Sequence, residues 1–159
     1  MSEILANASS PPTLDAAGIA SLIPHHGSMC LLDSVQYYDA LSIKCSAQSH
    51  RLPTNPLREQ GRLHAVCGVE YAAQAMAIHG ALLASRSTAS PRGGRLAALR
   101  SLDMHVARLD DIDAELQIVA TQVMGDGNNM IYAFSIHAEC RPLLSGKATV
   151  VLMPDPQES

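Results

Sequence analysis

The chain has 159 residues, enough for one domain that buries roughly two thirds of the surface of its unfolded chain without help from a disulfide or a metal. Hydrophobic residues make up 47% and charged residues only 16%, and so low a charged fraction predicts that part of the surface is covered in an oligomer. The net charge is −4 and the Lys and Arg residues are scattered, which argues against nucleic acid as a partner because phosphate contacts need clustered cations.

Both ends of the chain are predicted to be polar extensions of one domain. Residues 1–12 are rich in Ser, Ala and Pro and are predicted to form a flexible leader, and residues 155–159 a polar tail. The leader lacks the basic and apolar regions of a signal peptide, and the longest apolar run, residues 75–84, is too short to span a bilayer. We therefore expect one domain over residues 13–154, in the cytoplasm and without a membrane span.

The first part of this domain is predicted to form a short helix and a hairpin. Residues 14–23 have apolar side chains at helical spacing and stop before Pro24, where helices commonly end. Residues 29–38 and 41–49 are apolar, β-branched-rich runs around a short turn, which is typical of two paired strands. Residues 50–67 mix prolines, a glycine and charges and are predicted to form an irregular loop.

A long helix is predicted over residues 69–85. It is apolar on nearly every face, which indicates burial on nearly every face. Glu70 and Gln74 lie one turn apart on the same side of it, so they are polar groups within a core helix. A carboxylate in such a place is a candidate active-site group. The alternatives are that Glu70 only caps the helix and that Gln74 is a core amide with its hydrogen bonds satisfied.

The second half of the chain reads as a meander of strands. A glycine-rich turn is predicted at residues 125–129, and Ser145-Gly146 is predicted to form a second turn. Between and around these turns, alternating or apolar runs predict strands over residues 95–109, 114–124, 130–141 and 148–153. One long helix with an antiparallel sheet of five or six strands predicts an α+β fold in which the sheet wraps around the helix.

No cofactor and no metal site is expected. The cysteines are widely spaced and read as reduced core residues (Cys30, Cys45, Cys67 and Cys140), and the seven histidines are not clustered at ligand spacing. Arginines flank the loop after the long helix (Arg86, Arg92, Arg95 and Arg100). They are candidates to contact an acidic carrier protein or a phosphate, with a solvated rim as the alternative.

Three segments resemble one family, the hotdog-fold 3-hydroxyacyl-acyl-carrier-protein dehydratases. Leu22 to Val35 is similar to the family's opening "L-P-H-R-x-P-x-L-L-x-D-R-V" segment, residues 70–74 match its central-helix "E-x-x-A-Q", and the final strands, ending at Val150, resemble its meander. The pattern Gly-x-Glu-Tyr-x-Ala-Gln after Gly-Arg-Leu is most similar to the branch found with aryl polyene and xanthomonadin pigment synthesis. The resemblance implies a hotdog fold, an antiparallel sheet of about five or six strands wrapped around one long central helix.

The resemblance also implies a reaction, the dehydration of a 3-hydroxyacyl thioester on acyl-carrier protein to the 2-enoyl thioester, in fatty-acid or polyene synthesis. It implies a dimer whose active site takes a histidine from one subunit and a carboxylate from the other. The chemistry needs a base and an acid, and we predict His50 as the base and Glu70 as the acid. Gln74 would orient Glu70 or the substrate, and backbone N–H groups near Gly68 would stabilise the enolate.

One motif departs from the family pattern. Where the family has "H-F-P-G-x-P", this chain has Ser49 to Pro56, with His50 one position out of register. His64 is the second candidate for the base. Two further hypotheses stay open: a dehydratase-like subunit without its own base that completes a heterodimer with an active paralogue, and a hotdog acyl-thioesterase in which a carboxylate activates water.

Overall fold

The computed structural model describes residues 13–24, 27–86 and 93–153, so the predicted leader, residues 1–12, and tail, residues 155–159, lie outside it. The main elements are α1 (Ala16–Ala20), β1 (Ser34–Tyr38), β2 (Ser42–Ala47), α2 (Gly68–Ser85), β3 (Gly94–Met104), β4 (Leu116–Gly125), β5 (Asn129–Ala138) and β6 (Arg141–Leu152). Short 3-10 turns occur at η2 (Gly27–Met29), η3 (Ser49–Arg51) and η4 (Ala65–Cys67).

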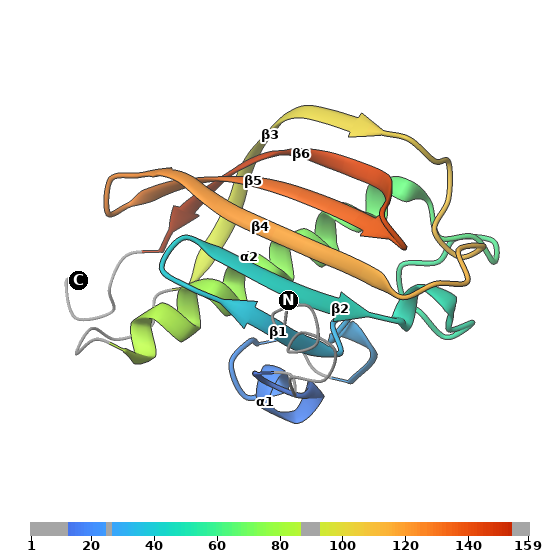
Figure 1. Ribbon diagram of the computed structural model, residues 1–159, viewed down its shortest axis with the longest axis horizontal. Coiled ribbons are helices and arrows are strands. Elements are labelled where there is room, and N and C mark those ends of the chain that lie inside the picture. The colour runs from blue at the N-terminus through green and yellow to red at the C-terminus, as the bar shows by residue number, and fades with distance from the viewer. Residues whose placement is uncertain (1–12, 25–26, 87–92, 154–159) are drawn as a thin grey trace, which may run out of the picture.

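The strands form one antiparallel six-stranded sheet in the order β1-β2-β4-β5-β6-β3. The helix α2 lies along one face of this sheet (Figure 1), where it packs against β2, β4 and β5. Because β3 follows α2 in the chain but pairs with β6, α2 carries the chain from the β2 side of the sheet to its opposite edge. This arrangement confirms the prediction of one long central helix wrapped by an antiparallel sheet.

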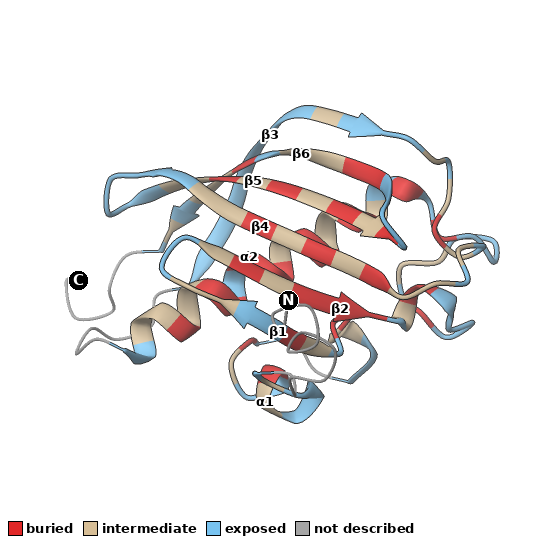
Figure 2. Ribbon diagram, viewed as in Figure 1, coloured by how far each residue is buried: buried red, intermediate tan, exposed pale blue. Residues whose placement is uncertain are grey.

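The core lies between α2 and the inner face of the sheet. Every second side chain of the central strands points to this face, and these side chains are buried (Leu116, Ile118 and Ala120 on β4; Tyr132, Phe134 and Ile136 on β5). Figure 2 shows the resulting alternation along β4 and β5, whereas β3 is exposed along almost its whole length. By length and composition alone Ala65–Ser85 could cross a membrane. In this fold the segment supplies the central helix, and its packing against the sheet accounts for its apolar composition.

The predicted turn at Ser145-Gly146 is wrong, because β6 continues through both residues. The chain reverses instead at Glu139 and Cys140, whose φ angles are 50° and 66°, as the two central residues of a type I′ hairpin require. Gly146 is small for a different reason. A Cβ atom there would lie 3.0 Å from Cζ of Phe134, so this glycine marks a close approach of a core ring to the strand.

Candidate active site

A largely apolar cavity of about 350 Å³ extends along one side of α2. Glu70 and Gln74 line it near the start of the helix, and small residues line it further along (Ala73, Ala77, Gly80 and Ala81). From Glu70 to Ala81 the helix advances roughly 16 Å. The facing wall comes from strands β3, β5 and β6 (Leu96, Met130, Tyr132, Val150 and Leu152). The cavity is therefore suited to an extended apolar chain with a carboxylate near one end.

The small residues on this side of α2 create the cavity. A Cβ atom added at Gly80 would meet nothing within 4 Å, and Ala77 is exposed although it lies in the middle of the helix. The spacing of Ala73, Ala77 and Gly80 places them on one helical stripe. Small side chains would allow the sheet to approach the helix closely, but part of the space along this stripe stays unfilled.

Glu70 is half-buried and lies in the second turn of a continuous helical segment. The turn η4 runs directly into α2, because Cys67 and Gly68 both have right-handed helical backbone angles. The first turn of that segment is therefore Ala65–Gly68 rather than the start of α2. Since the effect of the helix dipole falls off within the first turn, Glu70 lies beyond the positions on which the dipole acts most strongly.

Backbone N–H groups near Gly68 were predicted to stabilise the enolate, and the N–H of Gly68 itself is not free to do so. This N–H already donates to the carbonyl oxygens of Ala65 and Val66. Gly68 is buried, and a Cβ atom there would lie 2.7 Å from Cδ2 of Leu144. Gly68 is a glycine because the helix passes close to β6 at this point.

Gln74 is only 1% exposed, and both ends of its amide are bound to the backbone. Its Oε1 accepts from the N–H of Leu31 at 3.0 Å, and its Nε2 donates to the carbonyl of Met29 at 2.7 Å. These bonds hold the segment before β1 on α2, which is one reason why the first strand begins at Ser34 and not at residue 29. Gln74 is thus a satisfied core amide at the cavity wall, and its polar atoms are not directed to Glu70.

His50 lies in η3, immediately after β2, and its side chain is fully buried. Its Nε2 donates to the carbonyl of Ile112 at 2.9 Å, and its Nδ1 is buried with no hydrogen-bond partner among the residues that the structure describes. Burial lowers the pKa of His50, an effect larger than the opposing one of the Ile112 and Ala114 carbonyls. His50 does not line the cavity that contains Glu70. In the single chain the two predicted catalytic residues are therefore not brought together.

A buried network, which the sequence reasoning missed, fixes the segment around His50. Asn55 Nδ2 donates to the hydroxyl of Tyr71 at 3.0 Å and to the carbonyl of Ser49 at 2.9 Å. Burial raises the pKa of Tyr71, so its hydroxyl keeps its proton and donates to Oγ of Ser49 at 2.7 Å. Oγ of Ser49 in turn donates to the carbonyl of Leu31. The sequence signal that could have indicated this network is Tyr71 itself, because a hydroxyl on an otherwise apolar helix needs buried hydrogen-bond partners.

The other candidate histidines do not complete the site within the described residues. His64 precedes η4 with its side chain 52% exposed, and its Nε2 lies 4.0 Å from Oε2 of Glu59. His25 and His26 lie outside the described residues. His79 is a buried core residue, with Nδ1 bonded to the Tyr132 hydroxyl and Nε2 to the Asp39 carbonyl. Among the described residues, no histidine lines the cavity beside Glu70.

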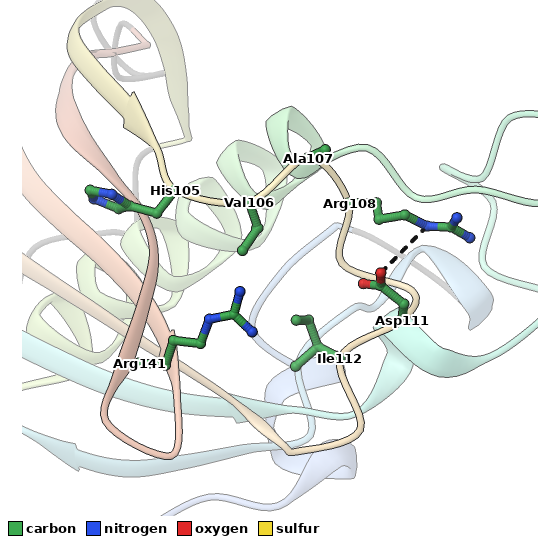
Figure 3. Close-up of a pocket in the computed structure, with 7 residues that line it drawn as sticks. All are labelled: His105, Val106, Ala107, Arg108, Asp111, Ile112 and Arg141. Atoms are coloured by element: carbon green, nitrogen blue, oxygen red, sulfur yellow. Dashed lines mark ion pairs between the residues drawn. The ribbon is translucent and has the colours of Figure 1, made fainter.

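A second cavity, of about 290 Å³, lies between the loop after β3 and the start of β6 (Figure 3). Arg141 points into it toward Val106 and Ile112. Arg108 pairs with Asp110 and lies 4.0 Å from Oδ2 of Asp111. This cavity shares no lining residue with the first. In the described part of the chain, no group of three or more His, Cys, Asp or Glu residues is arranged to hold a metal ion.

Comparison with known proteins identifies the family. A family model described as ApeP-like, ApeP dehydratase, matches residues 17–159. The chain belongs to the ApeP-like dehydratase family. Membership confirms the resemblance to hotdog dehydratases of the aryl polyene type. It supports a dehydratase activity in general for this ApeP-like chain. No curated protein is similar enough in sequence to match.

Solved structures share the fold of this ApeP-like chain. The dehydratase heterocomplex ApeI:P from Xenorhabdus doucetiae matches with a TM-score of 0.77 and 19% identity, over 94% of this chain and 95% of that one. A mutant thioesterase from Pseudomonas aeruginosa matches with a TM-score of 0.60 and 13% identity, over 90% of this chain and 96% of that one. A hypothetical thioesterase with coenzyme A from Streptococcus pneumoniae matches with a TM-score of 0.53 and 15% identity, over 76% of this chain and 85% of that one. At these identities the likeness shows a hotdog fold.

Proposed function

We propose that this chain is the carboxylate-bearing subunit of a heteromeric cytoplasmic dehydratase. Its substrate is a 3-hydroxyacyl thioester on an acyl-carrier protein, in aryl polyene or fatty-acid synthesis, and no cofactor is needed. One observation carries the proposal: Glu70 lies near one end of an apolar cavity along α2, and no described histidine lines that cavity with it. Membership of a dehydratase family supports the reaction class.

The reaction needs one base and one acid. The base removes a proton from C2, the C2–C3 double bond forms, and the C3–O bond breaks as the acid protonates the departing hydroxyl to give water. Glu70, once protonated, is positioned to be the acid for an acyl chain that occupies the cavity. Because His50 is buried in its own subunit and His64 lies away from the cavity, the base comes from the partner subunit.

The exposed edge of the sheet supports a heteromer. Strand β3 has one neighbour, β6, in the described chain, and ten of its eleven residues are exposed. Its large apolar side chains include Leu96, Leu99 and Met104, which are 38%, 39% and 49% exposed. A long apolar edge strand is a template for pairing with another chain. The structurally similar ApeI:P is itself a dehydratase heterocomplex.

Replacing Glu70 tests the proposal. The assay follows enoyl-thioester formation from 3-hydroxyacyl-acyl-carrier protein by a 1:1 complex of this chain with a second hotdog subunit from the same cells. We expect Glu70→Gln to lower kcat by about 10² to 10⁴-fold, since it removes the acid and keeps the shape. Glu59→Gln, which changes an exposed carboxylate outside the cavity, is the matched control and should leave kcat unchanged.

Two results would contradict the proposal at different points. An unchanged rate in Glu70→Gln would show that Glu70 is not the acid. Full activity of the chain alone, lost in His50→Gln, would show that the protein needs no partner and that its own histidine is the base.

An acyl-thioesterase is the second candidate. Two of the structural neighbours are thioesterases, and a carboxylate that activates water needs no histidine beside it. The same assay separates the two activities, because a thioesterase releases the free 3-hydroxy acid and a dehydratase releases the enoyl thioester.

A further inference from the structure

Three cations share the outer face of the sheet at its β3 edge. Lys147 on β6 lies directly opposite Arg100 on β3. Val151, four residues after Lys147 and therefore on the same face of β6, lies opposite Arg95. Directly paired residues point to the same face, and the alternate positions Leu96 and Val150 face the cavity. Arg95, Arg100 and Lys147, called here the edge cations, are all exposed.

The edge cations have no counter-ion in the part of the chain that the structure describes. Asp103 is the one carboxylate on β3. It lies opposite Ser145, and its Oδ2 is 3.9 Å from Nε2 of His105 and forms no ion pair with Lys147. Like charges placed directly opposite each other on paired strands are destabilising. The chain therefore keeps a repulsive pair, Arg100 and Lys147, next to the unpaired edge of its sheet.

This charge pattern is unfavourable for pairing with a second copy of the chain. The first seven residues of β3, Gly94–Arg100, contain two arginines and no carboxylate. When two copies pair antiparallel about a two-fold axis near the middle of this stretch, at residue 97 or between residues 97 and 98, each arginine finds only uncharged residues or arginines across the new ladder. Only registers shifted toward Met104 bring Asp103 opposite an arginine. Lys147 adds a third cation beside it.

We propose that the edge cations select the partner of this chain. They weaken pairing of β3 with a second copy and favour the edge strand of a different hotdog subunit that carries Asp or Glu at the facing positions. This inference rests on the heteromeric dehydratase proposed above and names what makes it heteromeric. Interfaces commonly gain specificity in this way, by placing like charges together in the wrong pairing and opposite charges in the right one.

A charge-swapped copy of the chain serves as the probe partner. The variant Arg100→Glu/Lys147→Glu, made with a tag of different mass, is mixed in equal amounts with the wild-type chain, and native mass spectrometry and sedimentation equilibrium measure the dimers. We expect the mixed dimer to form with a Kd at least about tenfold lower than that of either chain alone. The difference should shrink in about 1 M salt, which screens exposed charges.

Two further variants complete the experiment. Lys44→Glu reverses a charge on β2, away from the β3 edge in the same sheet, and should give no mixed dimer with the wild-type chain. Arg100→Gln/Lys147→Gln removes the repulsion without adding acids, and we expect it to self-associate more strongly than wild type. This neutral variant provides an independent reading if the acidic variant folds poorly.

The inference is overturned if the wild-type chain forms a homodimer as tight as the mixed dimer, if mixing adds no dimer, or if the neutral variant associates no better than wild type. Its failure is distinct from failure of the proposed function. An active complex whose assembly ignores these charges refutes only the role of the edge cations, whereas charge-dependent assembly of a complex without dehydratase activity refutes only the reaction.

Discussion

The side-chain amide of Gln74 joins the central helix to a segment 43 residues earlier in the chain. Leu31, whose N–H it accepts, is fully buried, and Met29 supplies the carbonyl that it binds. A single residue thus fixes the segment before β1 on the central helix, and both ends of its amide are occupied in doing so. Its expected contribution is to the stability of the fold.

Replacing Gln74 by Leu should destabilise the protein. The change keeps the volume but leaves the N–H of Leu31 and the carbonyl of Met29 without partners, at about 1 to 3 kcal/mol for each such buried group. We expect the free energy of unfolding in urea to fall by about 2 to 6 kcal/mol for the two groups together. Gln36→Leu, on the exposed side of β1, is the control and should stay within about 0.5 kcal/mol of wild type. Equal effects of the two changes would contradict the role given to Gln74.

His50 makes stability depend on pH. Burial lowers its pKa in the folded protein, whereas in the unfolded chain a histidine titrates near 6.5, at about its ordinary pKa. Below pH 6.5 the unfolded state therefore binds a proton more readily than the folded state. The contribution of neutral His50 to stability is fully present above pH 6.5 and is lost as the pH falls through the pKa of His50 in the folded protein.

We expect His50→Gln, which keeps a donor toward Ile112, to reduce the slope of unfolding free energy against pH below 6.5. One such histidine contributes at most about 1.4 kcal/mol per pH unit. His79 and His137, whose pKa values burial also lowers, leave a residual slope. Urea titrations between pH 5 and 8 measure the change. Parallel curves for wild type and His50→Gln would show that His50 is not held neutral.

At the scale of elements, the small residues of α2 define how much chain the cavity accepts. Ala77 lies about two helical turns beyond Glu70, one turn before Gly80, and is exposed to the cavity. Leu is a good helix former, so it can enter this position without disturbing α2. The length of the accepted chain should therefore be adjustable from one helix position.

We expect Ala77→Leu to reject long acyl chains and keep short ones, because its side chain would fill the cavity partway along. The measurement compares kcat/KM over a series of acyl-carrier thioesters of increasing length, with unfolding free energy as a check on folding. Ala84→Leu, one turn beyond the cavity on the same stripe, is the control and should leave the length profile unchanged. A uniform loss of activity at all lengths would contradict the proposed path of the chain along α2.

The elements with strong local signals were predictable, and those that depend on distant contacts were not. The long helix was predicted within one residue, because its apolar run continues from residue 69 to 85. Gly146 was misread because a glycine between strands suggests a turn, while the ring that requires it, Phe134, comes from another strand. The same holds for Gly68, whose packing against Leu144 cannot be seen in its local sequence.

The candidate site was half predictable for the same reason. Glu70 stands out locally as a carboxylate in an apolar helix, and the structure places it in the main cavity. The position of His50 depends on the loop that ends at Glu115, some 60 residues later, whose Ile112 carbonyl holds the ring. The residues near His50 in the sequence give no sign of its contact with Ile112. The role of His50 as the base therefore stays a prediction that this geometry does not support.

At the scale of the whole molecule, the two edges of the sheet differ. At one edge β1 is short, and at the other β3 is long, apolar and cationic. A net charge of −4 for the whole chain thus coexists with a positive edge. Charge reversal at that edge, described above, should change which chain binds there, while reversal elsewhere on the same face should not.

The order of the strands also affects how the protein is made. On the ribosome β3 is complete at Met104, but its neighbour β6 is complete only at Leu152, 48 residues later by number. At about 5 to 20 residues per second, translation leaves β3 without a neighbour for roughly 2 to 10 s. During that interval a nascent chain exposes both edges of an apolar strand, which is when aggregation competes with folding. The arginines of β3 then protect the unfinished chain as well, because they keep neighbouring nascent copies from pairing.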